Sequence, residues 1–491
     1  MKASLTPLLN LFSNLVFDDE QMRKWLDKKT YQQFRLAINA DSKEILDIAL
    51  ANKIAEAMKN WAISKGATHY THWFQPLNGT SAEKHESFIT TTFDGKVILN
   101  FTGKDLIKGE TDGSSFPSGG LRNTHEARGY TAWDASNFAF VRNECLYIPA
   151  LFSSYTGEVL DKMTPLHRSS TLLKHQAIRL CRLFKKHSNH ARVVVGPEQE
   201  YFLIDKQMYD KRLDLKLTGR TLFGAKPPKS QELSDHYYGQ IKTRVMNYMI
   251  DLDKELWKLG IPSKTRHNEV APCQHELAPI FERISKAIYH NILIMEVMKK
   301  TAEKHGLVCL LHEKPFRGVN GSGKHNNWSV SVDGVGNLLD PGPTPESNYL
   351  FLLFICCVMK AVDNYQDIIR MTVASANNDH RLGAHEAPPA IISMFLGNEI
   401  YNVLHAFVYN EKYAKSLKKQ DHRLKYIVDM DVDTTDRNRT SPFAFTGNKF
   451  EFRMPGSSMN LASVNTVLNT IVADAISSIC ERLEKSKNLE S

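Results

Sequence analysis

Four segments that lie far apart in this chain place acidic or imidazole side chains on alternate residues, among residues that favour β-strands. Because residues i and i+2 of a strand point to the same face, such alternation gathers the charged side chains on one side of a sheet. Carboxylates are rarely buried together unless their charge is neutralised, since desolvating each one is costly. The pattern therefore predicts strands that hold cations between them. The four segments are 193–205, 267–281, 321–333 and 449–455.

The size of the chain predicts two or three domains, because 491 residues exceed what one hydrophobic core usually supports. The hydrophobic content of 42% and the charged content of 24% are typical of an ordinary soluble protein. The net charge of +8 is scattered along the chain and not gathered in blocks, so no nucleic-acid partner is expected. A mild positive charge of this kind suits anionic small substrates.

The cysteines and the apolar runs indicate a cellular setting. The seven cysteines are odd in number and form no CxxC pair, which favours a reducing, cytoplasmic location over a disulfide framework or a thiolate zinc site. The longest apolar run, 350–359, is too short to span a bilayer and is expected in a buried helix, so no membrane association is predicted. Residues 5–17 have apolar side chains at helical spacing and are followed by acidic residues, which predicts an amphipathic packing helix and not a signal peptide.

Three regions of the chain differ in pattern. Residues 1–67 are predicted to form a helical extension, and residues 68–165, with short strand-like runs and turn signals, a small and mostly β domain. In residues 166–491 helical patterns alternate with the strand segments, which predicts an α+β or α/β catalytic domain with one sheet face left open. The helices predicted in this last region are 171–187, 241–259, 283–305, 347–371, 391–419 and 461–485.

Two familiar motifs are matched only in part. Residues 318–325 (GVNGSGKH) depart from the phosphate-loop pattern GxxxxGK[ST] at the last position, and the next residues alternate like a strand where that loop needs a helix. We interpret this segment as a glycine-rich turn that places His325 on a strand. The pair His275-Glu276 does not start a zinc-protease helix, because Pro279 stands where the second histidine is needed.

Six side chains on the alternating segments form the predicted metal-binding set. Five carboxylates and one imidazole suit the hard cations Mg²⁺ or Mn²⁺ better than a structural zinc ion. Two or three such ions on one platform usually orient phosphates for phosphoryl transfer, so the residues alone predict an ATP-dependent enzyme. Arg381, Arg439 and Arg453 lie in polar, glycine- and proline-punctuated segments, where arginine is suited to bind carboxylate or phosphate. The six predicted ligands are Glu198, Glu200, Glu269, Glu276, His325 and Glu451.

Taken in order, short motifs along the chain resemble glutamine synthetase, in the type III branch of that family. The resemblance runs from about residue 15 to the C-terminal region and includes type III segments such as THWFQPL (71–77) and TGRTLFGAKPPK (218–229). It implies an α+β fold with a small β-grasp-like N-terminal domain and a larger catalytic domain. In the catalytic domain, a curved antiparallel sheet would form a half-barrel flanked by helices. The carrying motifs are DGSSF (112–116), GPEQEYF (196–202), HNEVAP (267–272), NGSGKH (320–325), NRTSP (438–442) and FEFR (450–453).

The resemblance implies a role for each candidate residue. One metal site would use Glu200, Glu269 and Glu276, and the other Glu198, His325 and Glu451, with two to three Mg²⁺ or Mn²⁺ ions per active site. Asp112 would take a proton from ammonium, and Glu386 would be the flap carboxylate that closes over the intermediate. Substrate glutamate would be held by Asn320, Gly321, Arg381 and Arg453. The nucleotide would be held by Arg439, Ser329 and Lys449, with Arg439 also meeting the developing charge.

The activity implied is the ATP-dependent ligation of ammonia to the γ-carboxylate of L-glutamate through γ-glutamyl phosphate, which gives L-glutamine, ADP and phosphate. The partners implied are these small molecules and further copies of the chain in a ring-shaped hexamer or dodecamer, in which the loop of Asp112 reaches the neighbouring subunit. Two alternatives stay open: a γ-glutamyl ligase acting on an organic amine, and a non-catalytic assembly protein. Type III members usually continue past the position of Ser491, so we expect a short member or a fragment.

Overall fold

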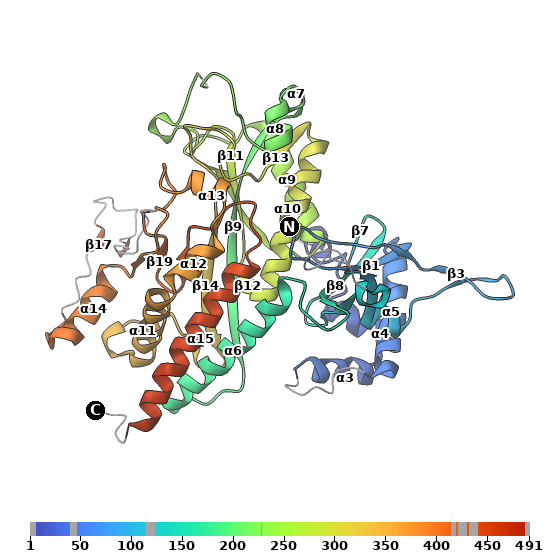
Figure 1. Ribbon diagram of the computed structural model, residues 1–491, viewed down its shortest axis with the longest axis horizontal. Coiled ribbons are helices and arrows are strands. Elements are labelled where there is room, and N and C mark those ends of the chain that lie inside the picture. Colours follow the sequence, from blue (N-terminus) through green and yellow to red (C-terminus); the bar gives the residue numbers. More distant parts are fainter. Residues whose placement is uncertain are drawn as a thin grey trace. The chain divides into compact units, whose positions relative to one another are not determined.

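The computed structural model describes residues 6–39, 47–113, 123–226, 228–413, 419–420, 430–431 and 440–486. These residues form two compact units, which are described separately. Unit 1 contains residues 1–166 and 250–263, and unit 2 contains residues 167–249 and 264–491. The predicted division into 1–67, 68–165 and 166–491 stays a prediction. Figure 1 shows helices and strands mixed along the whole chain, so the protein is of the α+β class.

Unit 1 is built on a six-stranded sheet in the order β2-β1-β8-β6-β5, with β7 paired to β8. The strands β1 and β8 are parallel, and the other pairs are antiparallel. Helix α4 (Ile48–Ser64) supplies the buried Trp61 to a core that also contains Phe17, Phe34 and Leu146. The strands are β1 (His69–Trp73), β2 (Glu86–Ser87), β5 (Lys108–Asp112), β6 (Arg128–Trp133), β7 (Phe140–Arg142) and β8 (Cys145–Ser154). The other helices are α1 (Thr6–Leu11), α2 (Asp19–Trp25), α3 (Lys28–Asn39) and α5 (Gly103–Ile107).

The predicted helix over residues 5–17 is wrong in its length. Helix α1 ends at Leu11, and Ser13 has a φ of 57°, in the left-handed region that stops an α-helix. The backbone N–H of Ser13 then donates to the carbonyl of Trp257 at 2.8 Å, within the same unit. The segment therefore turns back onto its own unit after a short helix.

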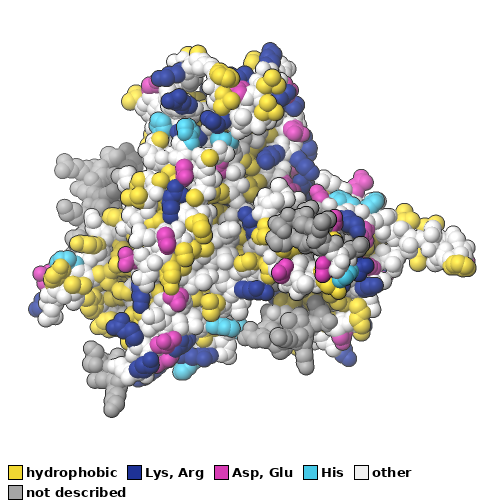
Figure 2. Space-filling view, viewed as in Figure 1, with side chains coloured by type: hydrophobic (Ala, Val, Ile, Leu, Met, Phe, Trp, Pro, Cys, Tyr) yellow, Lys and Arg dark blue, Asp and Glu magenta, His cyan; other side chains and the backbone are white. Residues whose placement is uncertain are grey.

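A two-stranded hairpin of unit 1 exposes apolar side chains. It consists of β3 (Ile89–Thr91) and β4 (Val97–Leu99), in which Ile89 lies opposite Leu99 and Thr91 opposite Val97. Directly opposite residues share one face, so three of these four side chains form an apolar face, and Ile89 and Val97 are 59% and 67% exposed. Figure 2 shows the hydrophobic side chains along this hairpin.

Unit 2 is built on a ten-stranded, curled half-barrel sheet in the order β10-β11-β9-β14-β20-β19-β16. In addition, β12 and β13 pair with β9, and β15 pairs with β14. The pairs formed by β9, β14 and β20 are antiparallel, whereas β16 and β19 are parallel. The strands are β9 (Ala191–Asp205), β10 (Ser263–Asn268), β11 (Gln274–Pro279), β12 (Glu282–Arg283), β13 (Leu307–Leu310), β14 (Lys324–Val332), β15 (Gly336–Asn337), β16 (Met394–Phe395), β19 (Phe443–Phe445) and β20 (Phe450–Phe452). The separate pair β17 (Lys419–Gln420) and β18 (Met430–Asp431) completes the described strands.

The helices of unit 2 follow most of the predicted spans. The apolar run 350–359 lies in α11, whose side chains are mostly buried, as predicted. The predicted helix 391–419 is wrong in its bounds, because Gly397 and Asn410, both with positive φ, delimit the shorter α14. The helices are α7 (Lys206–Asp210), α8 (Leu213–Thr218), α10 (Ile284–Lys304), α11 (Tyr349–Asn364), α12 (Gln366–Thr372), α13 (Ala376–Arg381), α14 (Asn398–Tyr409) and α15 (Ala462–Lys485). Two more helices, α6 (Met163–Leu183) and α9 (Thr243–Lys258), have residues in both units.

Helix α15 covers one face of the central strand β14. Trp328 of β14 donates its indole N–H to Asn469 at 3.0 Å, and Asn326 exchanges two amide hydrogen bonds of 3.0 Å with Asn465. By length and composition α15 could cross a membrane, but 56% of its apolar window is buried, and it packs against α11 and α12. Its apolar residues thus serve the core of unit 2, and the opposite face of β14 is left for the site.

Candidate functional site

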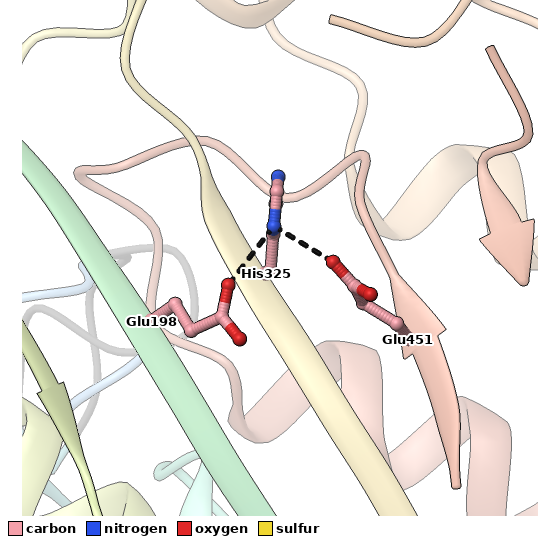
Figure 3. Close-up of side chains that lie close together, drawn as sticks. All are labelled: Glu198, His325 and Glu451. Carbon is pink, nitrogen blue, oxygen red and sulfur yellow. Dashed lines mark hydrogen bonds and ion pairs between the residues drawn. The ribbon is translucent and has the colours of Figure 1, made fainter. Parts of the chain in front are cut away.

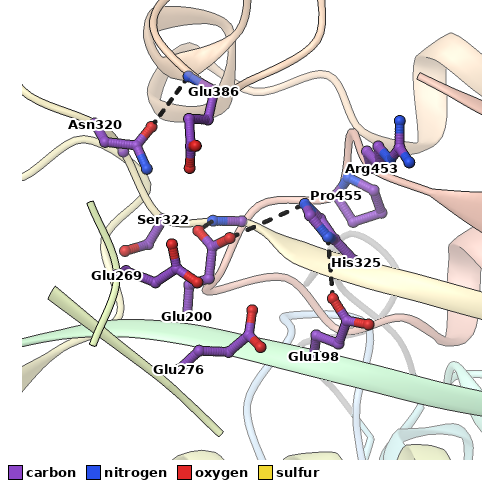
Figure 4. Close-up of polar contacts among 12 residues, drawn as sticks. Glu198, Glu200, Glu269, Glu276, Asn320, Ser322, His325, Glu386, Arg453 and Pro455 are labelled. Carbon is purple, nitrogen blue, oxygen red and sulfur yellow. Dashed lines mark hydrogen bonds and ion pairs between the residues drawn. The ribbon is translucent and has the colours of Figure 1, made fainter. Parts of the chain in front are cut away.

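The site is formed by side chains on one face of three neighbouring strands. His325 of β14 lies opposite Glu198 of β9, and Asn327 of β14 lies opposite Glu451 of β20. Because opposite residues of an antiparallel pair share a face, these side chains all project from the same side of the sheet. The pairing brings together residues from distant parts of the chain, as Figure 4 shows for the surrounding polar groups.

The first cluster consists of Glu198, His325 and Glu451 (Figure 3). The Nδ1 atom of His325 lies 3.1 Å from Oε2 of Glu198 and 2.9 Å from Oε1 of Glu451. The side chains of His325, Glu451 and Glu198 are 5%, 14% and 28% exposed, so water screens His325 and Glu451 least. A single positive group thus lies between two carboxylates in a nearly dry place.

The pKa values of the first cluster reflect this arrangement. Burial alone would lower the pKa of His325, but its hydrogen bonds to Glu198 and Glu451 outweigh that effect and raise it well above its ordinary value. Burial would raise the pKa of Glu451, yet the hydrogen bond and charge of His325, together with Arg453, lower it. These shifts favour ionised carboxylates with a positively charged group between them.

The second cluster consists of His267, Glu269 and Glu276. The Nε2 atom of His267 lies 3.1 Å from Oε1 of Glu276, and its Nδ1 atom lies 3.8 Å from Glu269. Glu269 and Glu276 are 1% and 8% exposed. The hydrogen bond that His267 donates to Glu276 is the main cause that raises the pKa of His267 to about 9. Here too, the arrangement favours a protonated imidazole beside buried carboxylates.

Glu200 lies beside this cluster and not within it. It is directly opposite Glu276 in the register of β9 and β11, and the backbone N–H of Gly323 donates to its Oε2 at 2.7 Å. Burial is the main cause that raises the pKa of Glu276, and the charges of Glu198 and Glu200 raise it further. Glu198, Glu200 and Glu276 thus crowd one face of the sheet, where the charges of the first two disfavour ionisation of Glu276.

The donor atoms of both clusters fit divalent cations with a preference for oxygen. Within each cluster the three ligand atoms lie within 4.8 Å of one another. Oxygen ligands at about 2.1 Å from a Mg²⁺ ion lie up to about 4.2 Å apart, so small rotations of the side chains would bring all three to one ion. The carboxylate-rich composition, without a cysteine, is typical of Mg²⁺ or Mn²⁺ and not of structural zinc.

The residues predicted to bind glutamate surround the glycine-rich turn before β14. Asn320 is buried, and its Oδ1 accepts a hydrogen bond from the backbone of Glu386 at 3.4 Å. Gly321 has no space for a side chain, because a Cβ atom there would clash with the carbonyl of Glu313. The structure thus places the predicted flap carboxylate Glu386 next to one of the predicted glutamate-binding residues (Figure 4).

The two predicted glutamate-binding arginines are both buried. The guanidinium of Arg381 donates to the backbone carbonyls of Arg453 and Met454, each at 3.2 Å. Arg453 donates to Oε2 of Glu451 at 3.3 Å and to the carbonyl of Ser441 at 3.3 Å. Arg453 is therefore joined directly to the first cluster, whereas Arg381 holds the backbone that follows β20.

The remaining predicted site residues, for the nucleotide and for the proton transfer, lie in separate parts of the fold. Ser329 is on β14, opposite Val194, and Lys449 precedes β20 and donates to the hydroxyl of Thr446 at 2.7 Å. Asp112 ends β5 in unit 1, whereas the residues of both clusters belong to unit 2. Arg439 lies outside the described residues.

Two residues of the site were not identified from the sequence. His267 lies close to Glu269 and Glu276, and its alternation with Glu269 in the sequence was the available signal. Asn327 follows His325 by two residues and so shares its face. Because an asparagine carries no charge, an alternation of charged residues gives no signal for it.

Comparison with known proteins agrees with this architecture. The family model described as the N-terminal region of type III glutamine synthetase matches residues 8–169, and the model of the glutamine synthetase catalytic domain matches residues 175–398. A solved glutamine synthetase of Plasmodium falciparum has a similar fold, with a TM-score of 0.60 and 15% identity over 89% of this chain and 77% of its own. At that identity, the likeness concerns the fold alone.

Curated relatives are similar over nearly the whole chain. The type-3 glutamine synthetase of Dictyostelium discoideum is 49% identical over 99% of this chain, and a glutamine synthetase of Bacteroides fragilis is 49% identical over 97%. The chain spans 66% of the length of each of these relatives, slightly less than two thirds. The two consecutive family models and these identities show that the chain belongs to the glutamine synthetase family, in its type III branch.

Proposed function

We propose that the chain is a glutamate–ammonia ligase that uses ATP to form L-glutamine through γ-glutamyl phosphate. The observation that carries the proposal is the pair of buried acidic clusters on one sheet face, with Glu386 beside Asn320 at its edge. Family membership supports the reaction class, because the matching catalytic-domain model covers both β9 and β14.

In the proposed assignment, two to three Mg²⁺ or Mn²⁺ ions, when bound, neutralise the phosphates of ATP and the charge that develops during phosphoryl transfer. Glu198, His325 and Glu451 would hold one ion. Glu269 and Glu276 would hold another, with Glu200 or His267 completing the set. The protons that now neutralise the two imidazole–carboxylate clusters would leave as the ions bind.

The chain's own residues would then bind the substrates. Arg453 would hold the glutamate, supported by the loop of Asn320 and Gly321, and the buried Arg381 would either contact it or fix the backbone around Arg453. Ser329, Lys449 and Arg439 would contact the nucleotide. The γ-carboxylate is a poor electrophile, and phosphorylation supplies the leaving group that an amine displaces.

Ammonium has no lone pair, so a base must remove a proton before the amine attacks the activated carbonyl. We assign this task to Asp112 and Glu386. The backbone contact between Glu386 and Asn320 would keep this carboxylate near the bound glutamate, and closure of its loop would exclude water from the acyl phosphate.

The remaining features of the fold and the assembly are also proposals. The central parallel pair β1 and β8, flanked by antiparallel strands, supports a β-grasp-like fold for unit 1. A ring-shaped hexamer or dodecamer is supported by the exposed apolar face of the β3–β4 hairpin, because apolar surface of this kind commonly marks an interaction site. Sedimentation of the purified protein tests the assembly, and a monomer would contradict it. A cytoplasmic location remains the expectation from the sequence.

The test of the reaction is phosphate release from ATP, Mg²⁺ and glutamate with and without ammonium, together with a glutamine assay. Ammonium-dependent phosphate release that matches the glutamine formed is the expected result. Phosphate release that responds to an organic amine and not to ammonium would replace the proposal with a γ-glutamyl-amine ligase. Absence of turnover in a folded sample that binds Mn²⁺ would favour a non-catalytic relative.

A further inference from the structure

The strand β14 carries two sets of polar side chains on its two faces. On the face away from the site, Asn326 and Trp328 are fully satisfied by Asn465 and Asn469 of α15. On the site face, Asn327 follows His325 and lies between Gly196 of β9 and Glu451 of β20 in the register. It is 9% exposed, so its amide has little contact with water.

The amide of Asn327 is oriented by its neighbours. Its Nδ2 atom donates to the carbonyl of Gly196 at 3.0 Å and to Oε1 of Glu198 at 2.8 Å. Both amide hydrogens are thereby used, and the reverse orientation would set Oδ1 against two acceptors. The orientation of the amide therefore follows from its chemistry, with Nδ2 facing β9 and Oδ1 facing away from it.

The two oxygens of Glu198 are held by different partners. Oε1 accepts from Asn327, and Oε2 faces the Nδ1 atom of His325 at 3.1 Å. Burial would raise the pKa of Glu198, but the hydrogen bonds from His325 and Asn327 outweigh it and lower the pKa. Asn327 thus restricts the rotation of the carboxylate and directs Oε2 toward the centre of the first cluster.

The Oδ1 atom of Asn327 is buried and accepts no hydrogen bond from any residue that the structure describes. A buried acceptor without a donor is unfavourable, and such groups are usually satisfied by protein, water or ligand. The carboxylates Glu198 and Glu451, its neighbours on the two flanking strands, offer no hydrogen for it when ionised. A water molecule held by a cation in the first cluster would supply the missing donor.

We propose that Asn327 is a positioning residue for the cation of the first cluster. Its Nδ2 fixes Glu198 as a ligand, and its Oδ1 accepts a hydrogen bond from a water molecule bound to that cation. The inference rests on the proposed binding of a divalent cation by Glu198, His325 and Glu451. In this role the uncharged Asn327 orients a metal ligand and holds a water molecule of the ion. Residues that contact metal ligands from outside commonly act in this way.

The experiment measures Mn²⁺ binding by electron paramagnetic resonance and the hydration of bound Mn²⁺ by water-proton relaxation, both without substrates. The variant Asn327→Leu keeps the approximate volume and removes both polar atoms. We expect it to weaken one class of Mn²⁺ site by about tenfold or more and to alter the proton relaxation of that class, while the other class keeps its affinity. The matched control is Asn326→Leu on the opposite face, which should lower the melting temperature and leave both Mn²⁺ affinities unchanged.

The outcomes separate the inference from the proposed function. Unchanged affinity and relaxation in a folded Asn327→Leu protein would overturn the role of Asn327, while the metal-binding assignment would stand. Failure of the unaltered protein to bind Mn²⁺ would overturn both. Asn327→Ala is the second variant, because it removes the same contacts without adding an apolar group beside Glu198, and selective loss of one site in it would support the inference in the same way.

Discussion

Glu276 of β11 lies directly opposite Glu200 of β9, so two carboxylates that are less than 10% exposed project side by side from one face of the sheet. Their mutual repulsion, together with burial, opposes ionisation, and the pKa of Glu276 is raised accordingly. The folded protein therefore carries an electrostatic cost at this site that a bound cation would remove.

This relationship predicts that Mn²⁺ stabilises the protein. At a free concentration of one hundred times the dissociation constant, one site adds about 2.7 kcal/mol to the free energy of unfolding. The measurement is the melting temperature in EDTA and in excess MnCl₂. Glu276→Gln should reduce the rise in melting temperature, whereas Glu20→Gln, whose side chain is 72% exposed on α2, should keep all of it. An undiminished rise in Glu276→Gln would show that this carboxylate binds no cation.

Glu451→Gln is expected to reduce glutamine formation by about 100-fold, at the upper end of the effects seen when metal centres are disturbed. The substitution keeps the size of the side chain but removes a charge that lies 2.9 Å from His325. Coupled assays of phosphate and glutamine at saturating ATP measure the effect, with Glu20→Gln as the control. Activity within twofold of the unaltered protein would exclude Glu451 from the metal centre.

The faces of the individual strands could be predicted from the sequence because they depend on local alternation. Glu198 and Glu200 share a face, as predicted, since β9 is a regular strand at this point. The pairing of the strands could not be predicted, because it depends on contacts between segments that are far apart in the chain. That Asn327 lies between Gly196 and Glu451 is visible only once β9, β14 and β20 are adjacent.

Local backbone conformation explains why some observed strands and helices end at other residues than the sequence predicted. Glu269 follows the end of β10 and does not lie in the strand, since its N–H donates to the carbonyl of Gln274 in a tight connection. That connection brings Glu269 close to His267. Similarly, the predicted helix 347–371 is divided at Tyr365, which has a φ of −126°. An amphipathic pattern indicates a buried face but does not reveal such a break.

Glu282→Gln is expected to change how stability depends on pH. Burial would raise the pKa of Glu282, but His290 and Lys286, at 2.5 and 2.6 Å, lower it. A carboxyl group with a lowered pKa contributes stability above its ordinary pKa of about 4.3 and loses that contribution as the pH falls through the folded-state value. The variant should therefore be less stable by about 2 kcal/mol at pH 7, with the difference shrinking below about pH 4.3.

Urea unfolding between about pH 2 and pH 8 measures this difference, because the contribution is lost only as the pH falls below about 4.3. Glu20→Gln serves as the control, because an exposed pair on α2 should give no measurable change at any of these pH values. A constant difference between Glu282→Gln and the unaltered protein across the whole range would mean that loss of packing, and not loss of the ionised group, destabilises the variant.

Gly323→Ala is expected to disturb the arginines of the site. A Cβ atom at position 323 would lie 2.7 Å from Cζ of Arg381, closer than packed atoms approach. Arg381 is 2% exposed and is held by the carbonyls of Arg453 and Met454, so it cannot move aside without losing those hydrogen bonds. The free energy of unfolding should fall by about 1–3 kcal/mol, as for other overpacked interiors.

The substitution should also affect glutamate binding. Because Arg381 donates to the backbone carbonyl of Arg453, a displaced Arg381 would shift Arg453. The KM for glutamate should therefore rise more than the KM for ATP. Urea unfolding and initial rates measure both effects, with Ser331→Ala, near the far end of β14, as the control. Equal changes in the two KM values would show that Arg381 supports the fold of the whole site and not the binding of glutamate.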